Sequence, residues 1–186
     1  MEQETDEQIA VRVQRGENDA FGALIERYQD KLMRYARKFL SDPDDASDIV
    51  QDTFIKAYRN LQSFDASRRF SPWIYRIAHN EFINALKKRR AGNVMFTIDF
   101  DTLFPHLAAT DTADSFALER DMRETLEHEL GRLDPKYREP LILYYLEGMD
   151  YKAISEVLQI PVSTVGVRLA RARAALKKLS GGTLYE

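Results

Sequence analysis

The sequence predicts an all-α protein made of two small helical domains joined by a flexible linker, the C-terminal one a helix-turn-helix. Three observations support this fold class. Apolar residues recur at intervals of three and four over most of the chain, as in helices with one buried face. Glycine and proline, which break helices, are scarce, with 8 and 6 residues among 186. Between the two periodic parts, roughly 25 residues lack sustained periodicity, an unusual length for a loop inside one compact domain.

Four helices are predicted in the N-terminal half. Their predicted ranges are 6–15, 18 or 19 to 40, 42–61 and 71–90. Asp42 followed by Pro43 combines a capping carboxylate with a proline that the first helical turn tolerates. Ser71 followed by Pro72 gives the same signal, so Ser71 is the expected cap of the fourth helix. We assign the N-terminal domain to residues 1–90.

The composition of the chain changes after residue 90, and helices are predicted again from residue 118. Residues 91–119 contain no lysine or arginine but several aspartates, so 91–117 is predicted to be an acidic linker. The C-terminal domain, 118–186, is predicted to contain helices at 118–130, at 134–146, after the capping Asp150, and at 164–179. Ser163 is the expected cap of the last helix. The tight turn before that helix predicts a helix-turn-helix.

Composition excludes several classes of protein. The chain has no cysteine, which rules out disulfides, thiolate zinc sites and a cysteine nucleophile. His79, His106 and His128 lack metal-ligand spacing and no glycine-rich phosphate loop is present, so we expect no enzyme activity, cofactor, metal or small-molecule substrate. No apolar run approaches membrane-spanning length and the acidic N-terminus is unlike a signal peptide, which predicts a cytoplasmic protein.

Charge is distributed unevenly along the chain. The net charge is −3, but lysine and arginine are concentrated in residues 76–90 and 168–178. Two basic segments in a nearly neutral chain predict binding to DNA at two places rather than over the whole surface. The second segment contains Arg168, Arg171 and Arg173 and no acidic residue, which is typical of the DNA-binding helix of a helix-turn-helix.

The stretch 64–90 has the residue types that bind a nucleic-acid strand. Arginine and lysine bind phosphates, amides hydrogen-bond to base edges, and aromatic rings stack on exposed bases. The candidate residues are Phe64, Arg68, Arg69, Phe70, Trp73, Arg76, Asn80, Asn84, Lys87, Lys88 and Arg89. The alternative for the aromatic residues is burial in the core. For the basic run, it is a solvated helix end that favours the helix dipole.

An acidic stripe is predicted on the helix 42–61. Asp44, Asp48 and Asp52 recur at intervals of four, with Gln51 beside them. Like charges at this spacing repel by a few tenths of a kcal/mol per pair, about as much as opposite charges attract. The stripe is therefore either a solvated face that tolerates this cost or a docking surface for a basic partner protein.

Taken in order, these segments resemble a bacterial sigma factor of the extracytoplasmic-function group over nearly the whole chain. Three segments resemble successive parts of the second domain of that family: AFGALIERYQDKLMRYARKFL, DDASDIVQDTFIKAYRNLQSF and FSPWIYRIAHNEFINALKKRR. A fourth resembles the family's fourth domain: LDPKYREPLILYYLEGMDYKAISEVLQIPVSTVGVRLARARAALKKL. The order of the segments and the linker between them also fit.

The resemblance implies partners and site residues. The partners are core RNA polymerase, through its beta-prime clamp and beta flap, promoter DNA and an anti-sigma factor. The residues implied to dock on the clamp are Asp48, Ile49, Gln51, Asp52 and Phe54. The loop 64–71 would capture a base flipped from the minus-ten element, with the helix 71–90 beside that base and its basic end on the DNA backbone. The linker would enter the polymerase near the RNA exit path.

The resemblance also implies that the last helix binds the minus-thirty-five element. The residues implied are Arg138, Ser163, Thr164, Gly166, Val167, Arg168, Ala170, Arg171 and Arg173. Gly166 and Val167 depart from the family pattern, which usually has a basic residue and a serine there. A helical glycine costs about 1 kcal/mol relative to alanine. Our hypothesis is that small side chains bring the helix close to the groove floor, where it reads shape and thymine methyl groups.

The competing interpretation is an autonomous helix-turn-helix regulator with a helical sensor or dimerisation domain. Such a regulator would bind duplex DNA tightly by itself, usually as a dimer on a palindrome. A sigma factor would need core polymerase.

Overall fold

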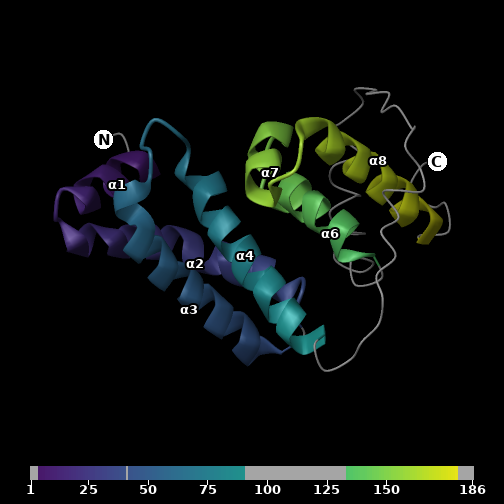
Figure 1. Cartoon of the computed structure of the whole chain (residues 1–186), viewed down its shortest axis with the longest axis horizontal. Coiled ribbons are helices and arrows are strands. Elements are labelled where there is room, and N and C mark those ends of the chain that lie inside the picture. Colours follow the sequence, from purple (N-terminus) through teal and green to yellow (C-terminus); the bar gives the residue numbers. More distant parts are fainter. Residues whose placement is uncertain (1–3, 41, 91–132, 180–186) are drawn as a thin grey trace. The chain divides into compact units, whose positions relative to one another are not determined.

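The computed structural model describes residues 4–40, 42–90 and 133–179, and every regular element within these ranges is a helix (Figure 1). The helices fall into two compact units, α1–α4 and α6–α8. The all-α prediction is thereby confirmed for the described residues. The predicted linker, 91–117, and the predicted helix 118–130 lie outside those residues, as do the side chains of 88–90 and 177–179.

Helix α1 (Asp6–Gln14) begins at a capping box that sequence analysis missed. The Thr5 hydroxyl accepts a hydrogen bond from the Gln8 amide at 3.2 Å, and the Thr5 amide donates to the Gln8 side chain at 2.9 Å. Ile9, Ala10 and Val13 form the buried face of the helix. The chain then turns at Gly16, whose φ of +100° lies in the region that favours glycine.

Helices α2 (Phe21–Arg37) and α3 (Pro43–Asn60) follow the predicted pattern, with shorter ends. A 3-10 turn (Asn18–Ala20) precedes α2, which ends before residue 40. The predicted cap of α3 is confirmed, because the Asp42 carboxylate accepts from the Asp44 amide at 3.0 Å. The buried face of α2 has the predicted spacing and consists of Phe21, Leu24, Tyr28, Leu32, Tyr35 and Ala36.

Helix α4 (Phe70–Arg90) begins one residue before the predicted cap, so the assignment of Ser71 as N-cap is wrong. The Phe70 amide donates instead to the Glu7 carboxylate of α1 at 2.9 Å. The first amides of a helix have no partner within the helix, and here a distant carboxylate satisfies one of them. Pro72 lies in the first turn, where its missing N–H costs no helical hydrogen bond.

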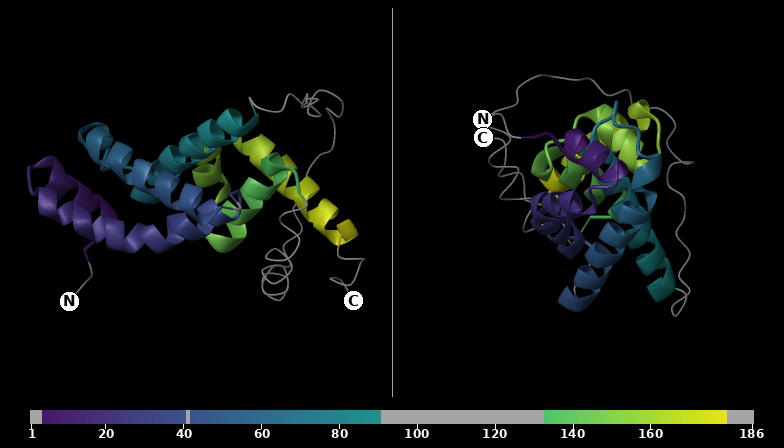
Figure 2. Two further views of the ribbon diagram at one scale, coloured as in Figure 1. Left: turned by 90° about the horizontal axis from the view of Figure 1, so that it is seen from below. Right: turned by 90° about the vertical axis from the view of Figure 1, so that its left-hand side faces the viewer.

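Helix α3 packs against both α2 and α4 in the N-terminal unit (Figures 1 and 2). Aromatic rings fill the interface of α2 with α4: Tyr35 makes edge contacts with Tyr75 and Phe82, at centroid distances of 5.3 and 5.1 Å. An ion pair of 2.5 Å between Lys56 and Glu81 joins α3 to α4 at the surface. The bundle thus holds α3 and α4 in a fixed register.

The C-terminal unit contains α6 (Pro135–Leu141), a π-helical segment (Ile142–Leu146), α7 (Tyr151–Leu158) and α8 (Val162–Leu179). The Asp134 carboxylate caps α6 by accepting from the Lys136 amide at 3.0 Å. The predicted cap of α7 is confirmed, because Asp150 accepts from the Ala153 amide at 2.7 Å. Gln159, with φ 54° and ψ 42°, makes the left-handed turn that ends α7.

The predicted cap of α8 is wrong. The helix begins at Val162, and the Val165 amide donates to the Pro161 carbonyl at 3.1 Å, so Ser163 lies inside the first turn. The helix-turn-helix formed by α7 and α8 is confirmed. Within the described ranges, no helix has both the length and the apolar character needed to cross a membrane.

Tyr28 makes the stability of the N-terminal bundle depend on pH in the alkaline range. Its ring is 3% exposed and its hydroxyl donates to Asp6 at 2.5 Å. Burial first, then the hydrogen bond to Asp6 and its negative charge, raise the pKa of Tyr28 above its ordinary value of 10.0. The folded state therefore keeps this proton longer than the unfolded state. The stabilisation is complete below pH ~10 and is lost as the pH rises further.

We predict that the free energy of unfolding falls more steeply above pH ~10 in the wild type than in Tyr28→Phe, by up to ~1.4 kcal/mol per pH unit. Denaturant titrations followed by Trp73 fluorescence measure both slopes, because Trp73 is the only tryptophan and lies on α4. Tyr58→Phe, at a residue 43% exposed, is the control and should keep the wild-type slope. Equal slopes for wild type and Tyr28→Phe would contradict the prediction.

Candidate nucleic-acid interface

The loop between α3 and α4 is a tight, polar turn at its tip. The Asp65 carboxylate accepts from the Ser67 amide at 3.0 Å and from the Ser67 hydroxyl at 2.7 Å, and the Arg68 amide donates to the Asp65 carbonyl at 3.0 Å. The hydrogen bonds from Ser67 lower the pKa of the Asp65 carboxyl below its ordinary value. Arg68 and Arg69 follow this turn and both are exposed. The turn therefore presents two guanidinium groups on a pre-formed loop.

The aromatic residues that flank the loop are buried, which corrects the expectation that they face a base. Phe64 is 5% and Phe70 is 0% exposed. Their centroids lie 5.4 Å apart, and each also contacts the half-buried Trp73, at 5.1 and 5.4 Å. Tyr28 completes this aromatic cluster at 5.4 Å from Phe70. The alternative, burial in the core, holds for Phe64 and Phe70, and of the four rings in this cluster only Trp73 is partly open to a ligand.

A polar strip runs along α4 away from the loop. Trp73, Arg76, Asn80, Asn84 and Lys87 recur at intervals of three and four, so they lie on one side of the helix. Trp73 and Arg76 are half-buried, and the other three are exposed. Among the predicted residues at the basic end, the side chains of Lys88 and Arg89 lie outside the described part. The strip and the loop tip present cations, amides and one aromatic ring side by side.

The acidic stripe on α3 is exposed as predicted, but two apolar neighbours are not. Asp44, Asp48, Gln51 and Asp52 are all exposed. Ile49 and Phe54, which were expected to meet the polymerase, are each only 8% exposed and belong to the core. Ile49 therefore serves to hold α3 in place, and Phe54 presents little surface to a partner. The stripe therefore offers a partner carboxylates and an amide rather than these apolar side chains.

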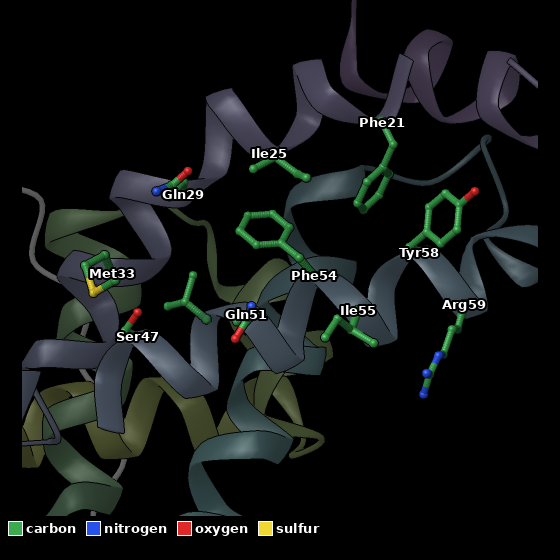
Figure 3. Close-up of a pocket in the computed structure, with 11 residues that line it drawn as sticks. Phe21, Ile25, Gln29, Met33, Ser47, Gln51, Phe54, Ile55, Tyr58 and Arg59 are labelled. Atoms are coloured by element: carbon green, nitrogen blue, oxygen red, sulfur yellow. The ribbon is translucent and has the colours of Figure 1, made fainter. Parts of the chain in front are cut away.

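An apolar groove between α2 and α3 was not predicted. It has a volume of about 520 Å³ and lies beside the acidic stripe. Figure 3 shows Phe21 and Ile25 of α2 facing Phe54 and Tyr58 of α3. The remaining lining residues are Gln29, Met33, Ser47, Val50, Gln51, Ile55 and Arg59. Ile55 is 41% and Tyr58 43% exposed, so part of the groove is open to solvent.

Helix α8 has a buried face and an outer face. Val165, Leu169, Ala172 and Leu176 are fully buried. Ser163 is exposed, and the other described candidates on the helix are half-buried, namely Thr164, Gly166, Val167, Arg168, Ala170, Arg171 and Arg173. The outer face near the helix start therefore has small side chains, with arginines around them.

Two arginines assigned to DNA make hydrogen bonds inside the C-terminal unit. Arg138 donates to the Leu133 carbonyl at 2.8 Å, and burial lowers the pKa of Arg138 below its ordinary value. Arg173 donates to the Tyr145 hydroxyl at 3.5 Å. Each guanidinium thus has a structural partner, which limits the donors it can offer a phosphate.

The comparisons with known proteins cover both units. Residues 24–92 match the family model for Sigma-70 region 2, and residues 123–176 match the model for Sigma-70, region 4. The ECF RNA polymerase sigma factor SigW of Bacillus subtilis is 33% identical over 90% of this chain and 92% of its own. The chain belongs to the extracytoplasmic-function sigma factors. This membership decides against an autonomous regulator, and sigma factors are not enzymes: they direct RNA polymerase to promoters.

Other relatives of this sigma factor also match over most of both chains. The RNA polymerase sigma-H factor of Pseudomonas aeruginosa is 37% identical over 95% of this chain and 94% of its own. Among solved structures, CnrH in complex with the cytosolic domain of CnrY matches with a TM-score of 0.70 and 30% identity, over 96% of this chain and 98% of that one. The sigma factor RpoE in complex with the anti-sigma factor NepR from Bartonella quintana matches with a TM-score of 0.62 and 25% identity, over 87% and 96%.

Gly166 provides a test of the close-approach hypothesis for α8. A Cβ added there would meet only the Tyr151 Cε2 atom, at 3.6 Å, which is ordinary van der Waals contact. We therefore predict that Gly166→Ala raises the free energy of unfolding of the C-terminal unit by about 1 kcal/mol. If the helix lies against the groove floor, the added methyl should also weaken binding of the polymerase complex to the minus-thirty-five element several-fold.

Urea denaturation and binding titrations measure the two effects separately. Gly22→Ala is the matched control, because Gly22 lies in α2 and a Cβ there would meet nothing within 4 Å. It should stabilise the N-terminal unit and leave minus-thirty-five binding unchanged. A Gly166→Ala variant that binds this element as tightly as the wild type would refute the close-approach hypothesis.

Proposed function

We propose that this sigma factor binds core RNA polymerase through α3, holds one strand of the opened minus-ten element on the loop and α4, and reads the minus-thirty-five element with α8. The single observation that supports this best is the continuity of the exposed loop tip with the polar strip of α4. Arg68 and Arg69 supply charge for phosphates, Asn80 and Asn84 supply donors and acceptors for base edges, and Trp73 supplies an aromatic face.

The energetics of capturing a base fit this arrangement. Extruding a base from the duplex costs a few kcal/mol. Stacking on an aromatic ring returns about 1–3 kcal/mol per base, and hydrogen bonds to the loop add to it. Because the turn at Asp65 and Ser67 is already formed in the free protein, little conformational entropy is lost when a base binds. A loop that is ordered beforehand can therefore favour the opened strand over the duplex.

Docking on the polymerase would use two adjoining surfaces of α3. Asp48, Gln51 and Asp52 form an exposed polar edge, and the apolar groove adjoins it through Gln51, Ile55 and Tyr58. A basic amphipathic helix of the polymerase clamp fits both surfaces. The charges select the partner and its orientation, while burial of the groove adds about 25 cal/mol per Å² of apolar surface removed from water.

The remaining assignments belong to the same proposal. Residues 1–90 form the domain for core docking and minus-ten melting, 91–117 the acidic linker, and 118–186 the domain for the minus-thirty-five element. The protein acts in the cytoplasm, where its polymerase and promoters are. An anti-sigma factor covers the docking surfaces until they are needed, because exposed surfaces of this kind would otherwise bind polymerase constitutively. The RpoE structure, named as a complex with the anti-sigma factor NepR, supports this part by analogy.

Run-off transcription with purified core polymerase tests the proposal. The wild-type chain should yield promoter-specific transcripts that depend on its presence. The double reversal Asp48→Lys with Asp52→Lys should weaken association with core polymerase at least tenfold, equivalent to about 1.4 kcal/mol, because two attractions become repulsions. Both side chains are exposed, so the fold should persist.

The matched control reverses a second exposed acidic pair with the same spacing, Glu26→Lys with Asp30→Lys on α2. It makes the same change in net charge and should leave both association and transcription near wild type. Equal weakening by the two double variants would mean that net charge rather than the stripe governs binding. Promoter-specific transcription that does not need this chain would overturn the proposed function.

A further inference from the structure

The entrance to the loop is attached to the end of α1 by one side chain. The Gln14 amide donates both of its N–H groups, one to the Leu61 carbonyl and one to the Phe64 carbonyl, each at 2.8 Å. In return, the Gln62 side chain donates to the Gln14 carbonyl at 3.3 Å. Because both acceptors are carbonyls, only the NH2 end of the amide can satisfy them. Gln14 therefore fixes the backbone where the chain leaves α3.

The residue that follows the loop is also attached to α1, at a position two turns before Gln14. The Glu7 carboxylate accepts from the Phe70 amide at 2.9 Å, at the first residue of α4. Residues seven apart lie on one face of a helix, so Glu7 and Gln14 point the same way, with about 10 Å of helix between them. The segment 65–69, which contains the exposed Arg68 and Arg69, lies between these two attachment points.

Helix α1 is itself held firmly against the bundle. Ile9, Ala10 and Val13 are buried, and Asp6 bonds to Arg27 at 2.6 Å and to the Tyr28 hydroxyl at 2.5 Å. A positioning element must be more rigid than what it positions, and these contacts meet that condition. The match to the family model begins at residue 24, so α1 and both attaching side chains lie outside it.

We infer that Gln14 and Glu7 are positioning residues for promoter specificity: they hold the two ends of the loop 65–69 so that its tip has the shape that accepts one particular base. The inference rests on the proposed function of the loop. Neither residue needs to touch DNA. If either attachment is lost, the loop still exists, but it samples other shapes, so the preferred base loses more binding than a wrong base does.

Promoter competition tests this inference. Complexes of core polymerase with wild type, Gln14→Leu or Glu7→Leu are compared on two templates that differ only at the captured minus-ten base. The readout is the ratio of open complexes on the preferred template to those on the substituted one. We expect this ratio to fall about fivefold to tenfold in both variants, as loss of one or two part-buried hydrogen bonds implies. General destabilisation would lower both yields and leave the ratio unchanged.

Two further variants separate positioning from structural support. Glu7→Gln keeps an oxygen acceptor for the Phe70 amide and should retain the wild-type ratio. Arg12→Ala removes ion pairs with Glu4 and Glu17 from the same helix, without touching the attachment points, and should also retain it. Thermal unfolding and core-binding titrations establish that each variant is folded. If Gln14→Leu does not fold, the pair Glu7→Leu and Glu7→Gln still decides the question.

The outcomes distinguish failure of the positioning role from failure of the proposed function. If the wild type opens promoters with core polymerase but Gln14→Leu and Glu7→Leu keep its ratio, the positioning role is wrong and the proposed function stands. If Glu7→Gln loses discrimination as fully as Glu7→Leu, the hydrogen bond to Phe70 is not the cause, which also overturns the inference. If the wild type opens no promoter, the proposed function itself fails.

Discussion

The contact between Phe64 and Phe70 is the interaction on which the N-terminal unit depends. These two buried rings bracket the loop and lie 5.4 Å apart, so the chain between them has to leave the bundle and return to it. Tyr28 and Trp73 pack on the pair and fix it to α2 and α4. Burial of large aromatic rings stabilises by several kcal/mol, and their edge contacts set a geometry. The core thus determines where the polar tip emerges.

The same constraint explains how one small bundle offers different surfaces to different partners. The core uses the aromatic residues of α2, α3 and α4, which leaves polar side chains on the outside of α4 and carboxylates on the outside of α3. The groove beside α3 keeps apolar surface open, through Ile55 and Tyr58. In the proposed function, DNA and polymerase therefore bind surfaces of unlike chemistry on neighbouring helices. The bundle fixes the spacing of these surfaces, partly through the ion pair of Lys56 with Glu81.

Local signals in the sequence predicted most of the fold. Asp42 and Asp150 cap helices as expected, because a capping carboxylate acts on amides two or three residues away. Ser71 and Ser163 have the same local signal, yet both helices begin earlier. For α4, the first amide finds its acceptor in Glu7, 63 residues away. A cap supplied from a distant helix leaves no trace in the neighbouring sequence.

The candidate site was predictable by residue type but not by exposure. The polar members of the loop and of α4 lie where their spacing placed them, whereas Phe64, Phe70, Ile49 and Phe54 are in the core. A ring that packs inside and a ring that stacks on a base look alike in a sequence, since both are apolar residues at helical spacing. The contacts of Gln14 with Leu61 and Phe64 span 47 and 50 residues, and only the folded chain reveals them.

The most direct test of the central claim uses Trp73, the only tryptophan of the chain, which lies half-buried between the aromatic cluster and the polar strip. A red-shifted tryptophan analogue at this position can be excited selectively in the complex with core polymerase. The account predicts a saturable fluorescence change when the complex is titrated with a single-stranded minus-ten oligonucleotide of the captured strand, and none with its complement. An unchanged signal at saturating oligonucleotide, or the same change with both strands, would contradict it.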